Sequence, residues 1–328
     1  MEEHLRTPAR PVLAQSTVSV RMSSSPYVLA FELGAARIRA AVFDLHQRRI
    51  GELQSIPTMA KQLMVVTLMN LKRAGEQARR EAGVEEPPLA VGMGSVGGAD
   101  QRTGCLLGLE SLPSLRGFCI SRFIESEFGA PLYLENDANC FTLAEALIGA
   151  GRGHPIVLGV TLGAGFGCGT VIHGRIHSGA SGTAGELVYG ASGEGPLDQL
   201  LCTSGVGRFY TRITGKAAPT PKQLGDMAEA GDSGAVETWR EYGRAVGHAL
   251  GVIVAVVDPS ICVIGGPVGR HFGWFQQSLD SALREHLTPP AAGHLKIAAS
   301  QLDHQAGVAG AAKYAFQRLA EIREAQRA

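Results

Sequence analysis

Residues 132–139 read LYLENDAN, an apolar run that ends abruptly at Glu135, Asn136 and Asp137. A polar turn is one explanation, because Asn and Asp bond their own backbone and are common helix N-caps. The segments around this run offer a second one. Strand-like runs alternate here with helical patterns, which predicts a mostly parallel sheet. Such sheets bind ligands beyond the carboxyl ends of their strands, and Asp137 stands at such an end.

The first half of the chain has the pattern of an α/β domain that opens with a hairpin. From Tyr27, two apolar runs flank ELGAAR at 32–37, and a turn leads into a third run. Residues 60–83 suit a helix, and LAVGMGSVGGAD at 89–100 suits a strand followed by a glycine turn. The amphipathic stretch 118–129 ends on Gly129, a good helix C-cap.

The second half repeats this scheme and so predicts a duplicated fold with a cleft between the halves. The strand before TLGAGFG at 161–167 resembles the strand before ELGAAR, and a long helix and a buried strand follow over 242–269. We expect a disordered tail over 1–26, with Met1 or Met22 as the start, and lobes over 27–138 and 139–304. A terminal helix at about 305–325 is expected to pack back on the first lobe.

Composition excludes several classes of function. The 328 residues carry 30 Lys+Arg and 30 Asp+Glu, so no net field attracts nucleic acid or an acidic membrane. No apolar run reaches the ~18 residues that a membrane span needs, and the N-terminus lacks a signal-peptide core. The six cysteines lie far apart in the sequence, which predicts small buried side chains in a reducing cytoplasm.

Glycine-rich turns mark the candidate binding loops. Gly163, Gly165 and the next two alternating glycines could cradle phosphate with bare backbone amides, or could belong to a bulged hairpin. The pair Gly265-Gly266 could let adenine or ribose lie against the backbone, or could be only a strand-to-helix turn. Glu186 follows the small residues GASGTAG, which would present its carboxylate freely, although most surface glutamates have no such role.

Together these segments resemble the ROK family of repressors, open reading frames and sugar kinases. The family motifs stand here as ENDAN at 135–139, VTLGAGFGCG at 160–169, GASGTAGE at 179–186, DPSICVIGG at 258–266 and DHQAGVAGAA at 303–312. Their order and spacing cover roughly residues 27–320, so the chain is identified as a member of this family.

The resemblance implies a two-lobed actin/hexokinase-like (ribonuclease H-like) α/β fold, a homodimer, and a sugar in the interlobe cleft. Asp137 would be the general base, and its ordinary pKa of about 3.9 would leave it ionised at pH 7. The expected sugar-binding residues are Gly97, Ser111, Asn136, Glu186 and Tyr189. The residues expected to bind ATP and Mg²⁺ are Glu32, Gly34, Gly163, Gly165, Gly265 and Gly266.

The chain departs from the family at both phosphate turns. The kinase pattern DxGGT is replaced by Glu32-Leu33-Gly34-Ala35-Ala36, and Ala164 replaces the threonine of the second turn. Two hydroxyl donors to phosphate are missing, and we expect the longer Glu32 side chain to reach Mg²⁺ through a water molecule. Phosphoryl transfer depends on such positioning.

The zinc and sugar motifs differ as well. Tyr189 takes the place of the family's zinc-binding histidine, and Cys202 is the only cysteine in the stretch that follows it, up to Ser204. Because a zinc site needs about four N/S ligands, the sequence predicts no zinc. Ser111 replaces an asparagine near the sugar, which leaves the identity of the sugar open.

Two functions fit this pattern. One is an ATP-dependent hexose kinase with a weakened nucleotide site. The other is a non-catalytic sugar sensor, similar to the repressors of the family, without its own DNA-binding domain. The 26 residues before Tyr27 are too few for a helix-turn-helix domain, which favours the kinase.

Overall fold

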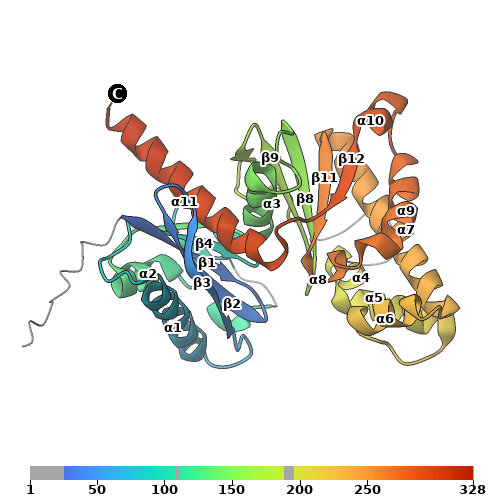
Figure 1. Cartoon of the computed structure of the whole chain (residues 1–328), viewed down its shortest axis with the longest axis horizontal. Coiled ribbons are helices and arrows are strands. Elements are labelled where there is room, and N and C mark those ends of the chain that lie inside the picture. Colours follow the sequence, from blue (N-terminus) through green and yellow to red (C-terminus); the bar gives the residue numbers. More distant parts are fainter. Residues whose placement is uncertain (1–25, 108–110, 188–195, 328) are drawn as a thin grey trace, which may run out of the picture.

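The computed structural model describes residues 26–107, 111–187 and 196–327. Within these residues the chain forms two five-stranded sheets and one small two-stranded hairpin. In Figure 1 the two sheets lie in separate halves of the molecule, with the first half in blue and the second in green to orange. The expected tail over 1–26 lies almost wholly outside the described residues.

The two sheets have the same strand order and the same directions, as the duplicated glycine turns predict. In each, three strands form an antiparallel meander and two more add in parallel beside the first strand. The first sheet contains, in order, β3 (Arg49–Pro57), β2 (Arg37–Asp44), β1 (Tyr27–Leu33), β4 (Ala90–Ser95) and β7 (Leu132–Asn136). The second sheet contains, in order, β10 (Arg175–Ile176), β9 (Phe166–Ile172), β8 (Ile156–Leu162), β11 (Ile261–Gly265) and β12 (Lys296–Ala299).

Two helices cover the outer face of the first sheet. They are α1 (Met64–Ala82) and α2 (Ile120–Phe128), which pack on a core that includes Phe31 and Met93. Both helices end at a glycine in the left-handed conformation, Gly83 with φ 66° and Gly129 with φ 67°. This conformation favours glycine because it has no Cβ, so the sequence marks both helix ends.

Two further helices lie between the sheets, as Figure 1 shows: α3 (Asp137–Ile148) and α11 (Ala306–Ala325). They share a buried core with both sheets, including Ala30 and Val263. Glycines permit the close packing. A Cβ on Gly159 of β8 would lie 2.1 Å from Oγ1 of Thr142, and one on Gly310 would lie 1.7 Å from the Cys140 carbonyl oxygen. The helix α3 is therefore held by close backbone contacts on more than one side.

The outer part of the second half is helical and packs around aromatic side chains. Trp239 and Tyr242 of the long helix α7 meet Phe275 of α9 within a buried cluster. In Figure 1 this helical layer lies beyond the second sheet. Its helices are α4 (Leu197–Leu200), α5 (Thr203–Thr214), α6 (Pro221–Glu229), α7 (Ser233–Val257), α8 (Gly266–Gly269), α9 (Phe272–Arg284) and α10 (Pro289–His294).

The cysteine prediction is wrong for one pair. Cys105 and Cys119 form a disulfide with a Cα–Cα distance of 3.7 Å. Cys105 belongs to the small hairpin of β5 (Ala99–Asp100) and β6 (Cys105–Leu106), and Cys119 is the N-cap of α2. Fourteen residues separate them, so only the fold brings them together. The other four, Cys140, Cys168, Cys202 and Cys262, are free and buried as expected.

No helix among the described residues is both long and apolar enough to cross a membrane.

Candidate active site

Asp137 is the first residue of α3 and directly follows the end of β7. The N-cap is Asn136, whose Oδ1 accepts hydrogen bonds from the backbone N–H groups of Ala138 at 2.8 Å and Asn139 at 3.1 Å. The Ala138 N–H also lies 2.9 Å from Oδ1 of Asp137. The polar-turn explanation is therefore confirmed, since Asn136 is a helix N-cap, and the same cap also fixes the position of the Asp137 carboxylate.

Gly94 of β4 forms the floor beneath Asp137. A Cβ on Gly94 would lie 3.0 Å from the Cys140 sulfur and 3.5 Å from the Cα of Asp137. In the first sheet, Gly94 pairs with Glu32 on one side and with Glu135 on the other. This row places Glu32 and Glu135 on either side of Gly94, and the missing Cβ of Gly94 gives α3 room to pack closely above it.

The pKa of Asp137 differs from the value that the sequence suggests. Removal of the carboxyl group from water raises its pKa to about 7, and the Glu32 and Glu186 carboxylates add to the rise. The expectation of an ordinary pKa near 3.9 is wrong because the burial of Asp137, and its closeness to Glu32 and Glu186, depend on the fold. A base of this pKa is well matched to proton transfer near neutral pH.

Asn136 links two of the other expected sugar-binding residues. Its Nδ2 donates to Oε1 of Glu186 at 2.8 Å and to the backbone oxygen of Gly97 at 3.4 Å. Gly97 has φ 86°, so its turn favours glycine. The structure therefore gathers Gly97, Asn136 and Glu186 beside Asp137. Asn136 uses its amide to hold the other two, while Glu186 is exposed.

Glu135 is a buried residue next to Asn136 for which no role was expected. Its Oε1 accepts from the Asn136 N–H at 2.8 Å and from Nδ2 of Asn139 at 3.0 Å, and its Oε2 accepts from Nε2 of Gln101 at 2.5 Å. Burial raises the pKa of Glu135. Asn139, the second amide of the ENDAN motif, therefore serves to hold Glu135. Glu135 in turn fixes the position of Gln101.

Glu32, the expected metal-binding carboxylate, is engaged in an ion pair. Nη1 of Arg39 donates to its Oε1 at 2.8 Å. The neighbouring turn is held by the Gly34 N–H, which donates to the Arg37 oxygen at 3.1 Å, and by Thr58 Oγ1, which donates to the Gly34 oxygen at 2.7 Å. The sequence could have indicated Arg39, since a hairpin centred on Ala35-Ala36 places residue 39 opposite residue 32.

The second glycine turn joins β8 to β9. The Gly163 N–H donates to the Gly165 oxygen at 3.0 Å, and the Gly163 oxygen accepts from the N–H and Oγ1 of Thr203 at 2.7 and 2.9 Å. The following glycines serve packing instead. A Cβ on Gly169 would lie 2.7 Å from the Ala138 oxygen, so this glycine lets α3 approach β9.

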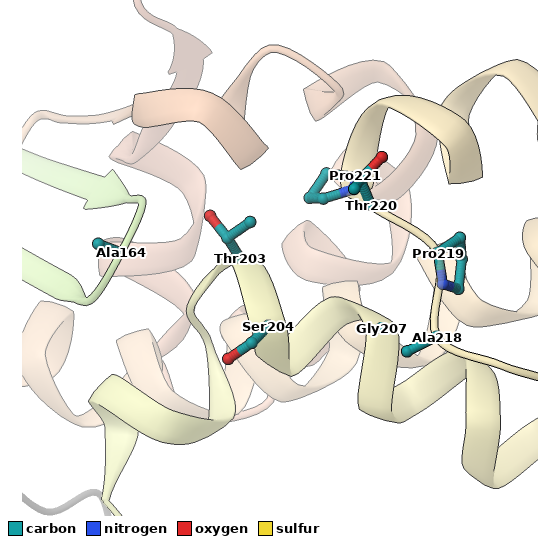
Figure 2. A pocket seen from close by; sticks show the side chains of 8 residues that line it. All are labelled: Ala164, Thr203, Ser204, Gly207, Ala218, Pro219, Thr220 and Pro221. Carbon is teal, nitrogen blue, oxygen red and sulfur yellow. The ribbon is translucent and has the colours of Figure 1, made fainter. Parts of the chain in front are cut away.

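Figure 2 shows a cavity of about 400 Å³ beside this turn. Ala164 lies on one side of it, the start of α5 forms its floor, and the segment before α6 closes the other side. The lining residues are Ala164, Thr203, Ser204, Gly207, Ala218, Pro219, Thr220 and Pro221. This cavity was not predicted, because its walls come from the β8–β9 turn, α5 and the segment before α6, which share no recognisable motif.

Gly265 and Gly266 lie at the end of β11, next to the turn at 163–165. Gly266 has φ 83°, and a Cβ there would lie 2.5 Å from the Leu162 oxygen. A Cβ on Gly265 would meet the Phe141 ring at 2.4 Å. Both glycines therefore have a packing reason, and both also line a second cavity of about 270 Å³ that includes Arg270 and Asp303.

The remaining expected residues are less informative. Ser111 is half-buried, and its Oγ has no hydrogen-bond partner among the residues that the structure describes. Tyr189 lies outside those residues. Within the described ranges, no group of three or more His, Cys, Asp or Glu side chains is arranged to hold a metal ion. The absence of zinc stays a prediction.

The comparisons with known proteins agree on one family. The model of the ROK family matches residues 28–318. A glucokinase of Thermotoga maritima is 28% identical over 272 residues, covering 76% of this chain and 86% of that protein. An N-acetyl-D-glucosamine kinase of Mannheimia succiniciproducens is 28% identical over 304 residues, covering 86% of this chain and 97% of that protein.

Among solved structures, the ROK hexokinase from Thermus thermophilus superposes with a TM-score of 0.75 at 31% identity. The match covers 90% of this chain and 99% of that one, so the shared architecture is the two-lobed hexokinase-like fold. The motifs, the duplicated sheets, the site around Asp137 and these matches lead to one conclusion: the chain belongs to the ROK family.

Proposed function

We propose that this chain is an ATP-dependent sugar kinase that acts on a hexose or an N-acetylhexosamine. The observation that carries the proposal is the placement of Asp137. Its carboxyl, with a pKa of about 7, lies beside the group formed by Gly97, Asn136 and Glu186, at the start of the helix that packs against β9. The kinase names of the relatives and the ROK hexokinase structure support the same reaction.

In this reaction a sugar hydroxyl attacks the terminal phosphorus of ATP. The new bond joins the sugar oxygen to phosphorus, the bond between this phosphorus and the ADP oxygen breaks, and the hydroxyl proton moves to Asp137. Glu186 and the Gly97 backbone would bind other sugar hydroxyls. A sugar that left these polar groups unpaired would bind less well, which is the basis of selectivity.

The nucleotide would approach from the second half of the molecule. The cavity of about 400 Å³ is large enough for a nucleoside and opens beside Ala164, in the turn expected to face the phosphates. Thr203 stands at this junction, since its N–H and hydroxyl both hold the Gly163 oxygen. We propose that this cavity takes the base and ribose, while the turns at 163–165 and 265–266 face the phosphate chain.

When bound, Mg²⁺ would neutralise phosphate charge. The residues at the first phosphate turn fit such an ion poorly, because Oε1 of Glu32 accepts from Arg39 and its Oε2 packs against Gly307. A Cβ on Gly307 would lie 2.7 Å from that oxygen. We assign no step to a metal held by Glu32.

A second candidate function is a sugar sensor that does not phosphorylate. The ion pair of Glu32 and Arg39 favours it, together with the alanines at 36 and 164, because the motif residues Asn136, Asp137 and Glu186 are retained while the phosphate turns have lost hydroxyl donors. Such a protein would report sugar by changing its conformation or its partner. The chain would then bind sugar without consuming ATP.

A coupled assay of ADP release over common hexoses and N-acetylhexosamines separates the two functions. We expect slow, sugar-dependent ADP release with wild type and a loss of about 10²–10⁴ in turnover with Asp137→Asn. Sugar phosphate should appear in the same samples by mass spectrometry. Tight sugar binding without any sugar phosphate after long incubation would reject the kinase and favour the sensor.

The lobe boundaries at 138/139 and 304/305, the cytoplasmic location and the homodimer remain proposals from the sequence. The β7–α3 junction supports the first boundary, because the strand that closes the first sheet ends there and α3 passes between the sheets. The loop before α11 supports the second, since this helix packs on the first sheet at Gly92.

A further inference from the structure

The ion pair between Arg39 and Glu32 occupies a defined row of the first sheet. The two residues are direct partners in the antiparallel pair of β1 and β2, and Gly94 is the partner of Glu32 on the other side. Their side chains are 22% and 18% exposed, so both are largely withdrawn from solvent without being fully buried. Arg39 thus belongs to the same row as the floor of Asp137.

This row brings the guanidinium towards Gly94, the residue beneath Asp137, where the transferred phosphoryl group of the proposed reaction would lie. Neighbouring strands are ~4.8 Å apart, so the backbone of Arg39 lies roughly 10 Å from that of Gly94. An arginine side chain spans much of this distance. One of its N–H groups binds Glu32. Arginine has five N–H donors in a planar fork, and this geometry suits phosphate oxygens.

Glu32 is bound in a way that suits a positioning role. Its Oε1 holds Arg39, and its Oε2 lies against Gly307 in the first turn of α11. A carboxylate that binds a divalent ion, directly or through a water, needs an oxygen free to do so. Here both oxygens already have neighbours, and the positive charge beside Glu32 is an arginine.

We propose that Arg39 binds the phosphate chain of the nucleotide, and that Glu32 is its positioning residue instead of a metal ligand. This inference rests on the proposed kinase function. The guanidinium supplies positive charge at the first phosphate turn, where the hydroxyl of the family's threonine is replaced by Ala36. The nucleotide therefore binds this chain with a weak dependence on Mg²⁺, because a resident cation already faces its phosphates.

The test measures ADP binding by calorimetry, with and without Mg²⁺, and does not depend on turnover. Arg39→Ala is expected to weaken metal-free ADP binding by about 10- to 100-fold, the usual effect of losing a hydrogen bond to a charged group. The ADP affinity of Arg39→Lys should lie between those of wild type and Arg39→Ala, because lysine keeps the positive charge but lacks the planar fork of donors. Glu32→Gln can still accept from Arg39, so it should change the affinity by less than about fivefold.

Arg48→Ala is the matched control. It removes the same charge from the turn between β2 and β3, at the other end of β2 from Arg39. There Arg48 pairs with Asp44, and its side chain is 74% exposed. It should leave ADP binding unchanged. Sugar binding and thermal unfolding of each variant show whether the fold and the sugar side are intact.

Two results would overturn the inference. Wild-type ADP affinity in Arg39→Ala would remove Arg39 from the phosphate site. A different pattern would make Glu32 a metal ligand that the ion pair with Arg39 blocks. In that pattern Arg39→Ala binds Mg²⁺-ADP more tightly than wild type does, and Mg²⁺ no longer changes the ADP affinity of Glu32→Gln. A wild type that binds ADP through Arg39 but forms no sugar phosphate would reject the kinase and leave this inference standing.

Discussion

The side-chain amide of Asn136 donates to Oε1 of Glu186 over 2.8 Å while its oxygen caps α3. One residue thus fixes both the start of the helix that carries Asp137 and the carboxylate of a glycine-rich loop 50 residues away in the sequence. The orientation of the loop that we propose to bind sugar is therefore coupled to the helix that carries Asp137, the proposed base.

Asn136→Asp separates these two roles. Aspartate is as good an N-cap as asparagine, so the melting temperature should change little. It cannot donate to Glu186, and it adds a negative charge next to Glu186 and Asp137. We expect calorimetry to show sugar binding weakened by about 10-fold or more, the effect of losing a hydrogen bond to a charged group. Unchanged sugar affinity in a stable variant would mean that the Glu186 contact has no part in binding.

The raised pKa of Asp137 predicts the pH dependence of activity. Because the carboxyl must be ionised to accept a proton and its pKa is about 7, kcat/KM for the sugar should rise as pH increases from 5 to 8. Asp137→Asn should remove this rise along with most of the turnover. A profile that is already flat above pH 5 would show that the base titrates near its ordinary value.

The same pKa predicts how stability changes with pH. The folded pKa of Asp137 lies above the ordinary value of 3.8, so its contribution to stability is fully present below about pH 3.8 and is lost as pH rises through about 7. Asp137→Asn has no such titration. Thermal unfolding from pH 4 to 8 should therefore show the variant gaining stability relative to wild type. A constant difference between the two would contradict the pKa shift.

Gly94→Ala tests the floor of the site. The new Cβ would lie 3.0 Å from the Cys140 sulfur, so Cys140 or the first turn of α3 must give way by a small amount. Since a displacement of about 1 Å at a reacting group costs on the order of 100-fold in rate, this smaller shift should lower turnover by less than that, and sugar binding by less still. Adding Cys140→Ala removes the nearest contact and should restore part of the turnover. No loss of turnover in Gly94→Ala would show that α3 can shift without moving Asp137.

Reduction of the Cys105–Cys119 disulfide should destabilise the fold. A cross-link that closes a loop of this length is worth about 3 kcal/mol in the chain-entropy model. Urea unfolding with and without dithiothreitol measures the difference, and the double variant Cys105→Ser/Cys119→Ser should not respond to the reductant. Thiol titration of the denatured, unreduced protein should count the four free cysteines. A count of six would rule the disulfide out in solution.

Much of the fold follows from local signals in the sequence. The opening hairpin, the strand before Asp137 and the terminal helix from 306 were all predicted, because each has a strong apolar period and a turn or cap at its boundary. The layer α4–α6 and the short strand β12 were not predicted. α4 and β12 have four residues each, too few for a clear apolar period, whereas the capping box of Thr220 and Gln223 is a local signal that could have indicated α6.

The features of the candidate site also divide into those that the sequence predicts and those that depend on the fold. Asp137, Asn136 and Glu186 could be named from their motifs, and the structure brings them together. The use of Asn136 as a bridge, the burial of Glu135 and the raised pKa of Asp137 could not be predicted, because each depends on groups distant in the sequence. Arg39 is an intermediate case, since hairpin symmetry alone points to it.

The packing of α3 has a consequence for motion between the two halves. Its close contacts at Gly159 and Gly169 fix it to the second sheet, while Gly94 lets its first turn rest on the first sheet. If the two halves rotate relative to each other, α3 should lie near the rotation axis, because it contacts both sheets. Displacements are smallest near such an axis. We therefore expect Asp137, the proposed base, to move very little while the loops that we propose to bind sugar and nucleotide move toward it.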